Sequence, residues 1–364
     1  MRRIHLSFAA LAIFAAAAQA AAPQYVIQIS VDGLGSSYLQ TLLDANRVPN
    51  FKRLITEGSS TLNARNDYDL TVTLPNHTTM VTGRGVHGVA SNGHKWTSNS
   101  DPAVNQTIHS VKGSYVASVY DVAHDNGLRT AMYATKTKFS LFDTSYNATN
   151  GAMDVTGPDN TRDKLDRYYQ NASSTSITNM FVSEMNANPF NFAFLHYSDG
   201  DNVGHSSGWG TTAYMDAIVA VDGQIGAVLS MIENNTLLNG NTAIILTADH
   251  GGYLKDHSTA SDARNYTIPF MVWGGDAAAG SDLYALNPGV RLDPLTGRPT
   301  YSAILQPIRN GDGANLALDM LALGAIPGST INASQDLVVP EPASIALLAA
   351  GCVALLRRSR RKAA

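Results

Sequence analysis

The segment Ala243-Ile244-Ile245-Leu246-Thr247-Ala248-Asp249-His250-Gly251-Gly252 joins an apolar run to a pair of reactive side chains. The run is short, half β-branched and bounded by polar residues, which predicts a buried strand. It delivers a carboxylate and an imidazole at the strand's carboxyl end, where sites form in open α/β sheets. The two glycines then let the backbone turn away. Such a junction suits a metal such as zinc but is also compatible with a polar turn. The residues at the ends of the other strands distinguish these two interpretations.

Predicted strands and helices alternate along the rest of the chain. We expect strands at 25–31, 128–133, 192–197, 243–246 and 268–273, and helices at 37–45, from 49 onward, from 73 to Gly83, at 114–125 and at 212–232. This alternation predicts an α/β fold, a three-layer α/β/α arrangement with a mostly parallel central sheet. The polar segments 143–169 and 280–300 are expected to be loops or small insertions.

The first 22 residues have the pattern of a secretory signal peptide. Met1-Arg2-Arg3 gives a basic start, residues 8–14 form an apolar core, and small residues lead to a cleavage position after Ala20 or Ala22. A first core helix is the weaker alternative, because the apolar segment has no polar face. We expect the catalytic domain to occupy residues 23–335.

We expect residues 336–364 to form a distinct tail. Val339-Pro340-Glu341-Pro342 precedes an apolar run at 343–356 and a basic end at 357–362. A helix of this length spans about 21 Å, short of a full bilayer crossing. The tail resembles the PEP-CTERM sorting signal of Gram-negative bacteria, which implies export and recognition by an exosortase-type membrane protease. A simple membrane anchor is the alternative.

Composition narrows the class of partner. Without the seven basic residues and one acidic residue of the two ends, the chain keeps 18 Lys and Arg against 28 Asp and Glu. A net charge of about −10 leaves no basic footprint for nucleic acid. The single cysteine, Cys352, lies in the tail, so the catalytic domain has no disulfide or thiolate ligand and depends on its hydrophobic core.

Three predicted strands end in acids: Asp32, the pair Asp199 and Asp201, and Asp249. His205 stands four residues after Asp201, so both side chains can reach one ion from a single helical turn. Each piece alone is compatible with a turn or a loop hydrogen bond. Together on one sheet edge they predict a metal site.

Two divalent metals about 4 Å apart need roughly six protein ligands. Asp32, Asp201, His205, Asp249 and His250 supply five. His257 is the only histidine after His250, so a further histidine ligand from downstream would be His257. Alternatively, His257 is a surface residue that binds no metal.

The predicted nucleophile is Thr73, where a strand-like stretch enters a helix at Leu74-Pro75. A hydroxyl there meets the positive end of the helix dipole, which also favours a phosphate, and a metal would lower the pKa of the hydroxyl. A simple N-cap is the alternative role. Thr71 is the competing hydroxyl, further from the helix start.

These motifs resemble the alkaline phosphatase superfamily in its type I phosphodiesterase/nucleotide pyrophosphatase branch. The matching pieces, in order, are Val31-Asp32-Gly33, Thr73-Leu74-Pro75-Asn76-His77 with Val81-Thr82-Gly83 and His87-Gly88, then Asp201-Asn202-Val203-Gly204-His205, and Asp249-His250-Gly251. The resemblance covers about residues 25–275.

The resemblance implies two zinc ions and a role for each motif. One ion would be held by Asp32, Thr73, Asp249 and His250, and the other by Asp201, His205 and His257. Asn92 would donate to a phosphoryl oxygen, although the loop before it is shorter by about two residues. Leu74 stands where nucleotide-cleaving members commonly carry an aromatic residue, and the last histidine comes sooner than in those members.

The sequence therefore predicts an exported hydrolase of phosphodiester or pyrophosphate bonds that acts through a covalent phosphothreonine on Thr73. Its substrate would be a small phosphate ester or nucleotide-like molecule. The expected location is the periplasm, cell surface or extracellular matrix of a Gram-negative bacterium, with C-terminal membrane anchoring as one form. A phosphomonoesterase is the second enzyme hypothesis, for which Lys136 and Lys138 are candidate dianion-binding residues. An inert surface or matrix protein that keeps the fold is the non-enzyme alternative.

Overall fold

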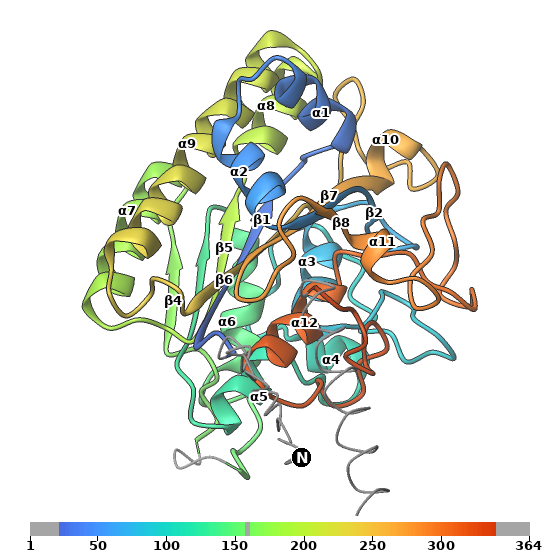
Figure 1. The fold of residues 1–364 in the computed structure, drawn as a ribbon. Coiled ribbons are helices and arrows are strands. Elements are labelled where there is room, and N and C mark those ends of the chain that lie inside the picture. The colour runs from blue at the N-terminus through green and yellow to red at the C-terminus, as the bar shows by residue number, and fades with distance from the viewer. Residues whose placement is uncertain (1–21, 157–160, 340–364) are drawn as a thin grey trace, which may run out of the picture.

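The computed structural model describes residues 22–156 and 161–339, which form an eight-stranded sheet in the order β4-β3-β5-β1-β6-β7-β2-β8 (Figure 1). The strands are β1 (Tyr25–Val31), β2 (Ser59–Arg65), β3 (Thr130–Ala134), β4 (Arg167–Gln170), β5 (Phe192–Tyr197), β6 (Thr242–Thr247), β7 (Thr267–Gly274) and β8 (Ser281–Asp282). The pairs from β4 to β6 are parallel, whereas β7 runs antiparallel to both β6 and β2. The mostly parallel sheet is confirmed.

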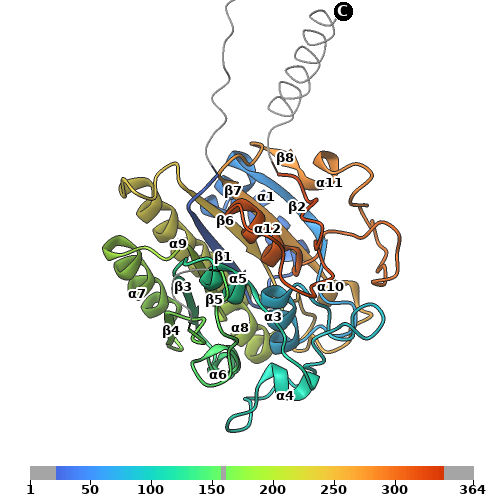
Figure 2. The same cartoon turned by 90° about the horizontal axis from the view of Figure 1, so that it is seen from below.

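Helices cover both faces of the sheet, which confirms the three layers (Figure 2). One layer contains α1 (Ser36–Asp44), α2 (Pro49–Glu57), α7 (Ser174–Ala187), α8 (Asp199–Ser207) and α9 (Thr212–Asn234). The other contains α3 (Thr73–Thr82), α5 (Val119–Asp125) and α12 (Asp312–Met320), with α4 (Ile108–Lys112) and α6 (Ser140–Tyr146) beside it. The short helices η1 (Thr137–Phe139), α10 (Ala263–Tyr266) and α11 (Leu283–Leu286) lie in connecting segments.

The central strands are apolar because both of their faces are covered. Every residue of β5 and β6 is buried, as parallel strands between two helical layers require. The helix expected at 114–125 begins only at Val119, because Ser118 caps it by accepting a hydrogen bond from the Asp121 N–H. The segment 143–169, expected to be a loop, contains the end of α6 and most of the edge strand β4.

The strand order decides where the predicted site residues meet. β3, β5, β1 and β6 are consecutive neighbours and parallel, so their carboxyl ends share one edge. Lys136, Asp201, Asp32 and Asp249 follow those strands within a few residues. One edge of the sheet therefore collects three carboxylates and an ammonium group.

Residues 336–339 belong to the folded part of the molecule. Leu337 and Val339 are buried, and the Val339 carbonyl accepts a hydrogen bond from Ala278 N at 2.8 Å. The fold therefore extends through Val339, past the boundary expected at 335. The predicted signal peptide and the tail from Pro340 lie outside the described residues.

Among the described residues, α9 is the one helix long and apolar enough to cross a membrane. It packs against α2, α7 and α8, and its Asp222 side chain is buried. The apolar residues of α9 therefore belong to the core of the domain.

Candidate functional site

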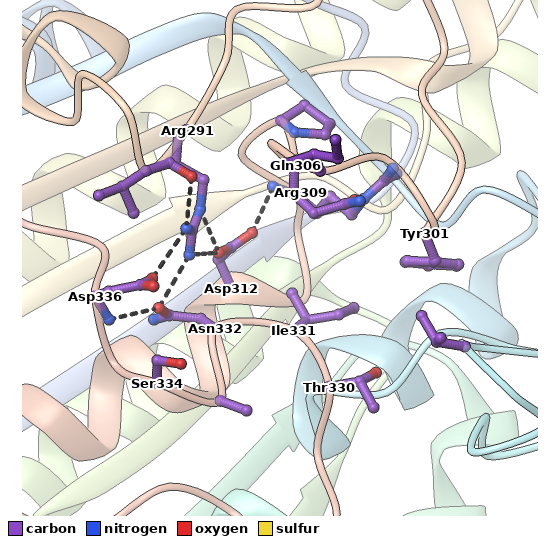
Figure 3. Close-up of a pocket in the computed structure, with 15 residues that line it drawn as sticks. Arg291, Tyr301, Gln306, Arg309, Asp312, Thr330, Ile331, Asn332, Ser334 and Asp336 are labelled. Carbon is purple, nitrogen blue, oxygen red and sulfur yellow. Dashed lines mark hydrogen bonds and ion pairs between the residues drawn. The ribbon is translucent and has the colours of Figure 1, made fainter.

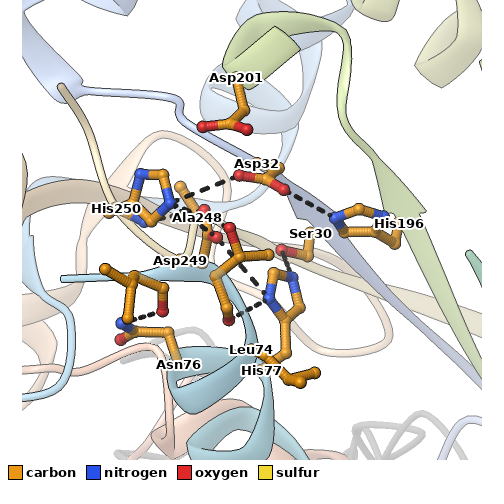
Figure 4. Close-up of polar contacts among 12 residues, drawn as sticks. Ser30, Asp32, Leu74, Asn76, His77, His196, Asp201, Ala248, Asp249 and His250 are labelled. Atoms are coloured by element: carbon orange, nitrogen blue, oxygen red, sulfur yellow. Dashed lines mark hydrogen bonds and ion pairs between the residues drawn. The ribbon is translucent and has the colours of Figure 1, made fainter. Parts of the chain in front are cut away.

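Three buried aspartates meet at the carboxyl edge of the sheet (Figure 4). The Asp32 carbonyl accepts a hydrogen bond from Asp201 N at 3.1 Å, and Asp249 Oδ1 accepts one from Gly33 N at 3.0 Å. Gly33 has a φ of 76°, and a Cβ there would lie 3.0 Å from the Asp201 backbone. A glycine at this position therefore lets the three strand ends approach one another.

Asp32, Asp249 and His250 form the first cluster, in which one ligand atom from each lies within 4.8 Å of the others. His250 Nε2 lies 3.5 Å from Asp32 Oδ1 and 3.2 Å from Asp249 Oδ2. Thr73 Oγ1 lies 3.4 Å from the same nitrogen. Thr73 is the first residue of α3, so the start of this helix lies beside the first cluster.

Asp201, His205 and His257 form the second cluster. Asp201 and His205 lie one turn apart on α8, and Asp201 Oδ1 lies 3.3 Å from His205 Nε2 and 3.5 Å from His257 Nε2. The two imidazole Nε2 atoms are 3.1 Å apart. His257 reaches this position because the loop after Gly251-Gly252 returns over α8.

The histidines of both clusters are held in one orientation by backbone carbonyls. Nδ1 of His250, His205 and His257 lies 2.8, 3.0 and 2.7 Å from the carbonyl oxygens of Gly251, Lys255 and Thr71. A carbonyl only accepts, so each Nδ1 carries the proton and each neutral ring offers the lone pair of Nε2. Burial, with His257 nearby, lowers the pKa of His250 to about 3, which keeps that ring neutral.

One oxygen of each aspartate has no hydrogen-bond partner within the described chain. These oxygens are Asp32 Oδ1, Asp201 Oδ1 and Asp249 Oδ2, all of them the atoms nearest to the imidazole Nε2 lone pairs. Buried carboxylate oxygens without a donor are costly, and lone pairs that face one another repel. Two groups of nitrogen and oxygen donors with this arrangement fit two divalent cations.

Two further side chains occupy the opposite oxygens. Lys136 Nζ lies 2.6 Å from Asp32 Oδ2 and 2.6 Å from Asp201 Oδ2. His196 Nε2 lies 3.1 Å from Asp32 Oδ2, and its Nδ1 accepts from Thr135 N at 3.3 Å. His196 therefore donates from Nε2, and the two residues leave the Oδ1 atoms facing the histidines.

The pKa values of the three buried aspartates are shifted in different directions. Burial alone raises the pKa of each, but Lys136 and His196 hold the pKa of Asp32 well below its usual range. Burial and Asp32 raise the pKa of Asp201, yet the neighbouring His205 and the charge of Lys136 bring it to about 2. For Asp249, burial and the charges of Asp32 and Asp201 raise the pKa well above its usual range. The site holds more negative charge than Lys136 balances.

The start of α3 distinguishes the two candidate hydroxyls. Val72 is the N-cap, Thr73 is the first helical residue, and no side chain caps the helix. The Thr71 hydroxyl donates to the His257 carbonyl at 2.5 Å, whereas Thr73 Oγ1 has His250 as its neighbour. Leu74 is fully buried, so its side chain offers no surface for a base to stack on.

Asn99, for which the sequence predicted no role, contacts the start of α3, whereas no such contact is found for Asn92 among the described residues. Asn92 lies in an exposed turn, and within the described parts of the chain its side chain makes no hydrogen bond. Asn99 Oδ1 instead accepts from Leu74 N at 2.9 Å, and Lys138 Nζ donates to the Asn99 carbonyl at 2.6 Å. Asn99 therefore lies beside the helix start, and the contact of Asn92 with a phosphoryl oxygen stays a prediction.

A buried network behind Thr73 was not predicted from the sequence. His77 Nδ1 lies 2.8 Å from the Thr73 carbonyl, and His77 Nε2 lies 2.8 Å from Ser30 Oγ (Figure 4). The ring of His77 packs edge-on against that of His196. Only the spacing of His77 one turn after Thr73 hints at this contact in the sequence. The Asp199 carboxylate, expected beside Asp201, accepts from the Ser174 hydroxyl instead and joins neither cluster.

A cavity of about 230 Å³ lies elsewhere, lined by Val89 and by residues between Val290 and Asp336 (Figure 3). Arg291 reaches across it to Asp312 at 3.0 Å and Asp336 at 2.9 Å. None of the residues of the two clusters lines this cavity. Its two guanidinium groups, of Arg291 and Arg309, are hydrogen-bonded within the domain, so we assign the candidate site to the strand edge.

Comparison with known proteins identifies the family. Residues 26–257 match the family described as type I phosphodiesterase / nucleotide pyrophosphatase. The chain belongs to this family. The matched region contains every residue of both clusters and Thr73.

Curated relatives match over shorter stretches. The 2,3-bisphosphoglycerate-independent phosphoglycerate mutase of Shewanella denitrificans is 31% identical over 142 residues, 37% of this chain and 24% of that protein. GPI ethanolamine phosphate transferase 1 of Candida glabrata is 28% identical over 129 residues, 35% of this chain and 12% of that protein. The chain thus spans a quarter or less of the length of these relatives.

Solved structures share the fold. Murine ectonucleotide pyrophosphatase / phosphodiesterase 5, in an inactive form in complex with AMP, superimposes with a TM-score of 0.57 at 16% identity, over 86% of this chain and all of that one. A protein in the alkaline phosphatase superfamily from Vibrio parahaemolyticus gives a TM-score of 0.56 at 13% identity, over 87% of this chain and 71% of that one. The fold is that of the alkaline phosphatase superfamily.

Proposed function

We propose that the protein is a two-metal hydrolase of phosphodiester or pyrophosphate bonds that works through a covalent phosphothreonine on Thr73. The observation that carries this proposal is the presence of a threonine hydroxyl beside two donor clusters whose aspartates are buried. Thr73 Oγ1 lies 3.4 Å from the nitrogen that His250 turns toward Asp32 and Asp249. Membership of the phosphodiesterase family supports the same class of reaction.

The proposed ligands divide between two zinc ions. Asp32, Asp249, His250 and Thr73 would hold one ion, and Asp201, His205 and His257 the other. Imidazole and carboxylate donors without thiolate suit zinc. The bound ions would supply positive charge that lowers the pKa of the Thr73 hydroxyl and offsets the charge developing on the phosphoryl oxygens.

The protein groups then define a two-step displacement. Thr73 Oγ1 loses its proton and forms a bond to phosphorus, while the bond from phosphorus to the leaving oxygen breaks and that oxygen leaves with the electron pair. Water then adds to phosphorus, the bond to Thr73 Oγ1 breaks, and the hydroxyl regains a proton. The N-terminus of α3 favours the anionic phosphoryl group in both steps.

We propose a nucleotide-like molecule as the substrate. The AMP complex of murine ectonucleotide pyrophosphatase / phosphodiesterase 5 supports a nucleotide-like substrate for this chain. A phosphomonoesterase is the second candidate, and the cation Lys136 between Asp32 and Asp201 favours it. The non-enzyme alternative, an inert matrix protein, would not need donor atoms oriented in two clusters.

We also propose export, from the signal-peptide pattern of residues 1–22 and the sorting pattern of residues 340–364. An exosortase-type protease would be the processing partner, and the tail would contact a membrane before processing. The periplasm, cell surface or extracellular matrix would then be the working location.

The test compares Thr73→Ala with Thr56→Ala, a matched change on the exposed side of α2, in the zinc-loaded protein. Aryl phosphate monoester, aryl phosphate diester and a dinucleotide serve as substrates. Thr73→Ala should lower turnover by roughly 10³-fold or more while both ions stay bound, because the aspartate and histidine donors remain. Thr56→Ala should match the unmodified protein. Normal turnover in Thr73→Ala would refute the mechanism, and an unmodified protein with neither zinc nor turnover would support the inert alternative.

A further inference from the structure

The side chain of Asn76, in the first turn of α3, holds the segment that precedes this helix. Its Nδ2 donates to the carbonyls of Leu70 at 2.8 Å and Val72 at 3.0 Å. Its Oδ1 accepts from Asp67 N at 2.9 Å and from Asn310 Nδ2 at 3.0 Å. A side-chain amide offers two donors and two lone pairs, so every hydrogen-bonding position of Asn76 is used. The segment before the proposed nucleophile is therefore held at three points by one buried amide.

Asn310 reaches this amide from the C-terminal part of the chain, outside the family-matched residues 26–257. It lies two residues before α12, is fully buried, and donates its backbone N–H to the Arg65 carbonyl at 3.0 Å. Both Nδ2 hydrogens of Asn76 go to carbonyls, so Asn76 Oδ1 faces Asn310, and Asn310 must be the donor. Asn310 Oδ1 has no hydrogen-bond partner among the described residues, so this amide contributes donors only.

Asn310 and its neighbour also contact the strand end that supplies the first cluster. Asn310 Nδ2 lies 3.4 Å from the carbonyl of Ala248, the residue before Asp249. Arg309 donates to the Asn66 carbonyl at 3.1 Å, and Asn66 Nδ2 donates to the Asp249 carbonyl at 3.0 Å. Two adjacent residues before α12 therefore connect the start of α3 with the end of β6.

This connection joins the two elements whose separation matters for the proposed reaction. Thr73 begins α3 and His250 follows β6, and Thr73 Oγ1 lies 3.4 Å from His250 Nε2. A displacement of a reacting group by about 1 Å can lower a rate roughly 100-fold. The hydrogen bonds of Asn310 go to Asn76 and to backbone carbonyls, so it acts on the hydroxyl through other residues.

We propose that Asn310 is a positioning residue that, through Asn76, holds Thr73 at the distance from the first cluster that the displacement requires. This inference rests on the proposed function, because Thr73 is the proposed nucleophile. It assigns to the removal of the amide a loss of turnover, with substrate affinity and metal content retained.

Asn310→Leu, which keeps the approximate volume, and Asn310→Ala, which does not, both remove the donor. The control is Asn315→Leu, because Asn315 is also fully buried and donates to the Ile331 carbonyl at 2.7 Å, beside Gly83 at the other end of α3. The zinc-loaded variants are compared in kcat and KM for the ester that the unmodified protein hydrolyses fastest, in zinc content and in unfolding temperature.

Both Asn310 variants should lower kcat by roughly 10- to 100-fold, with KM within about threefold and both ions bound, because only the nucleophile is displaced. Asn315→Leu should lower the unfolding temperature by a similar amount and keep the kcat of the unmodified protein. An unchanged kcat in both Asn310 variants, or an equal fall in kcat in Asn315→Leu, would overturn the proposal.

A combined variant tests the route and separates this inference from the proposed function. Asn76→Ala with Asn310→Leu should lose no more kcat than Asn76→Ala alone, because the two amides act in one series of contacts. Losses that multiply would contradict a route through Asn76. Normal turnover in Thr73→Ala would refute the proposed function and this inference with it. An inactive Thr73→Ala together with full kcat in Asn310→Leu would refute this inference alone.

Discussion

At the residue scale, the orientation of each cluster histidine is set by a backbone carbonyl. His257 illustrates this, since the Thr71 carbonyl takes its Nδ1–H and turns Nε2 toward Asp201 and His205. His257→Ala removes one of three donors and leaves the first cluster untouched. We expect zinc content to fall from two ions to one per chain and activity to fall by at least about 100-fold, beyond the loss typical of a supporting residue.

Elemental analysis after exhaustive dialysis, together with turnover, checks this prediction. His87→Ala is the matched control, because His87 is exposed and belongs to neither cluster. It should retain two ions and full activity. Retention of both ions by His257→Ala would remove His257 from the ligand set.

The aspartates that the sequence assigned correctly to the sheet edge share one property. Asp32, Asp201 and Asp249 each follow a strand closely, so chain position alone brings them to the sheet edge. Asn99 and His196 are placed by tertiary contacts, with Leu74 N and with Asp32. No local pattern carries that information, and the role of Asn92 that the motif implies stays a prediction.

At the element scale, one helix depends on another for its cap. α2 begins after Val48 without a side-chain cap of its own, and Asp222 of α9 accepts from Asn50 N at 3.0 Å and Phe51 N at 2.8 Å. Asp222→Ala should lower the free energy of unfolding by about 1–2 kcal/mol, the range for losing an N-cap. Asp222→Asn should lower it less, because an acceptor oxygen remains.

Urea unfolding of the zinc-loaded protein measures this effect. The control is Asp216→Ala on the same helix, whose carboxylate is exposed and pairs with Arg47 at the surface. It should change stability by less than about 0.5 kcal/mol. An Asp222→Ala variant as stable as the Asp216→Ala variant would show that α2 needs no cap from α9.

Elements with strong periodicity were predictable, and weakly patterned ones were not. β1, β5, β6 and α9 were predicted within a few residues of their observed bounds, because each has a continuous apolar run or stripe. β2 is polar at several positions and contains a register shift between Thr61 and Ala64. Its place beside the antiparallel β7 comes from pairing between distant segments, which composition does not reveal.

At the scale of the whole molecule, the two described ends of the chain lie on the edge of the sheet opposite the candidate site. Tyr25 N donates to the Asn241 carbonyl where β1 and β6 begin, and Val339 pairs with Ala278 just beyond the end of β7. The antiparallel β7 ends beside Ala243, at the amino end of β6. Changes at the C-terminal segment should therefore alter stability without touching catalysis.

Two truncations test this separation. A chain that ends at Val339 keeps the ion pair between Arg291 and Asp336 and the buried Leu337 and Val339, whereas a chain that ends at Gln335 loses all of them. Burying two such apolar side chains contributes roughly 3–6 kcal/mol. The shorter chain should therefore unfold roughly 10 °C lower in a thermal scan, with the same kcat/KM at 25 °C. Equal unfolding temperatures would show that residues 336–339 add nothing to the core, and a selective loss of kcat/KM in a folded short chain would contradict the placement of the site at the far edge.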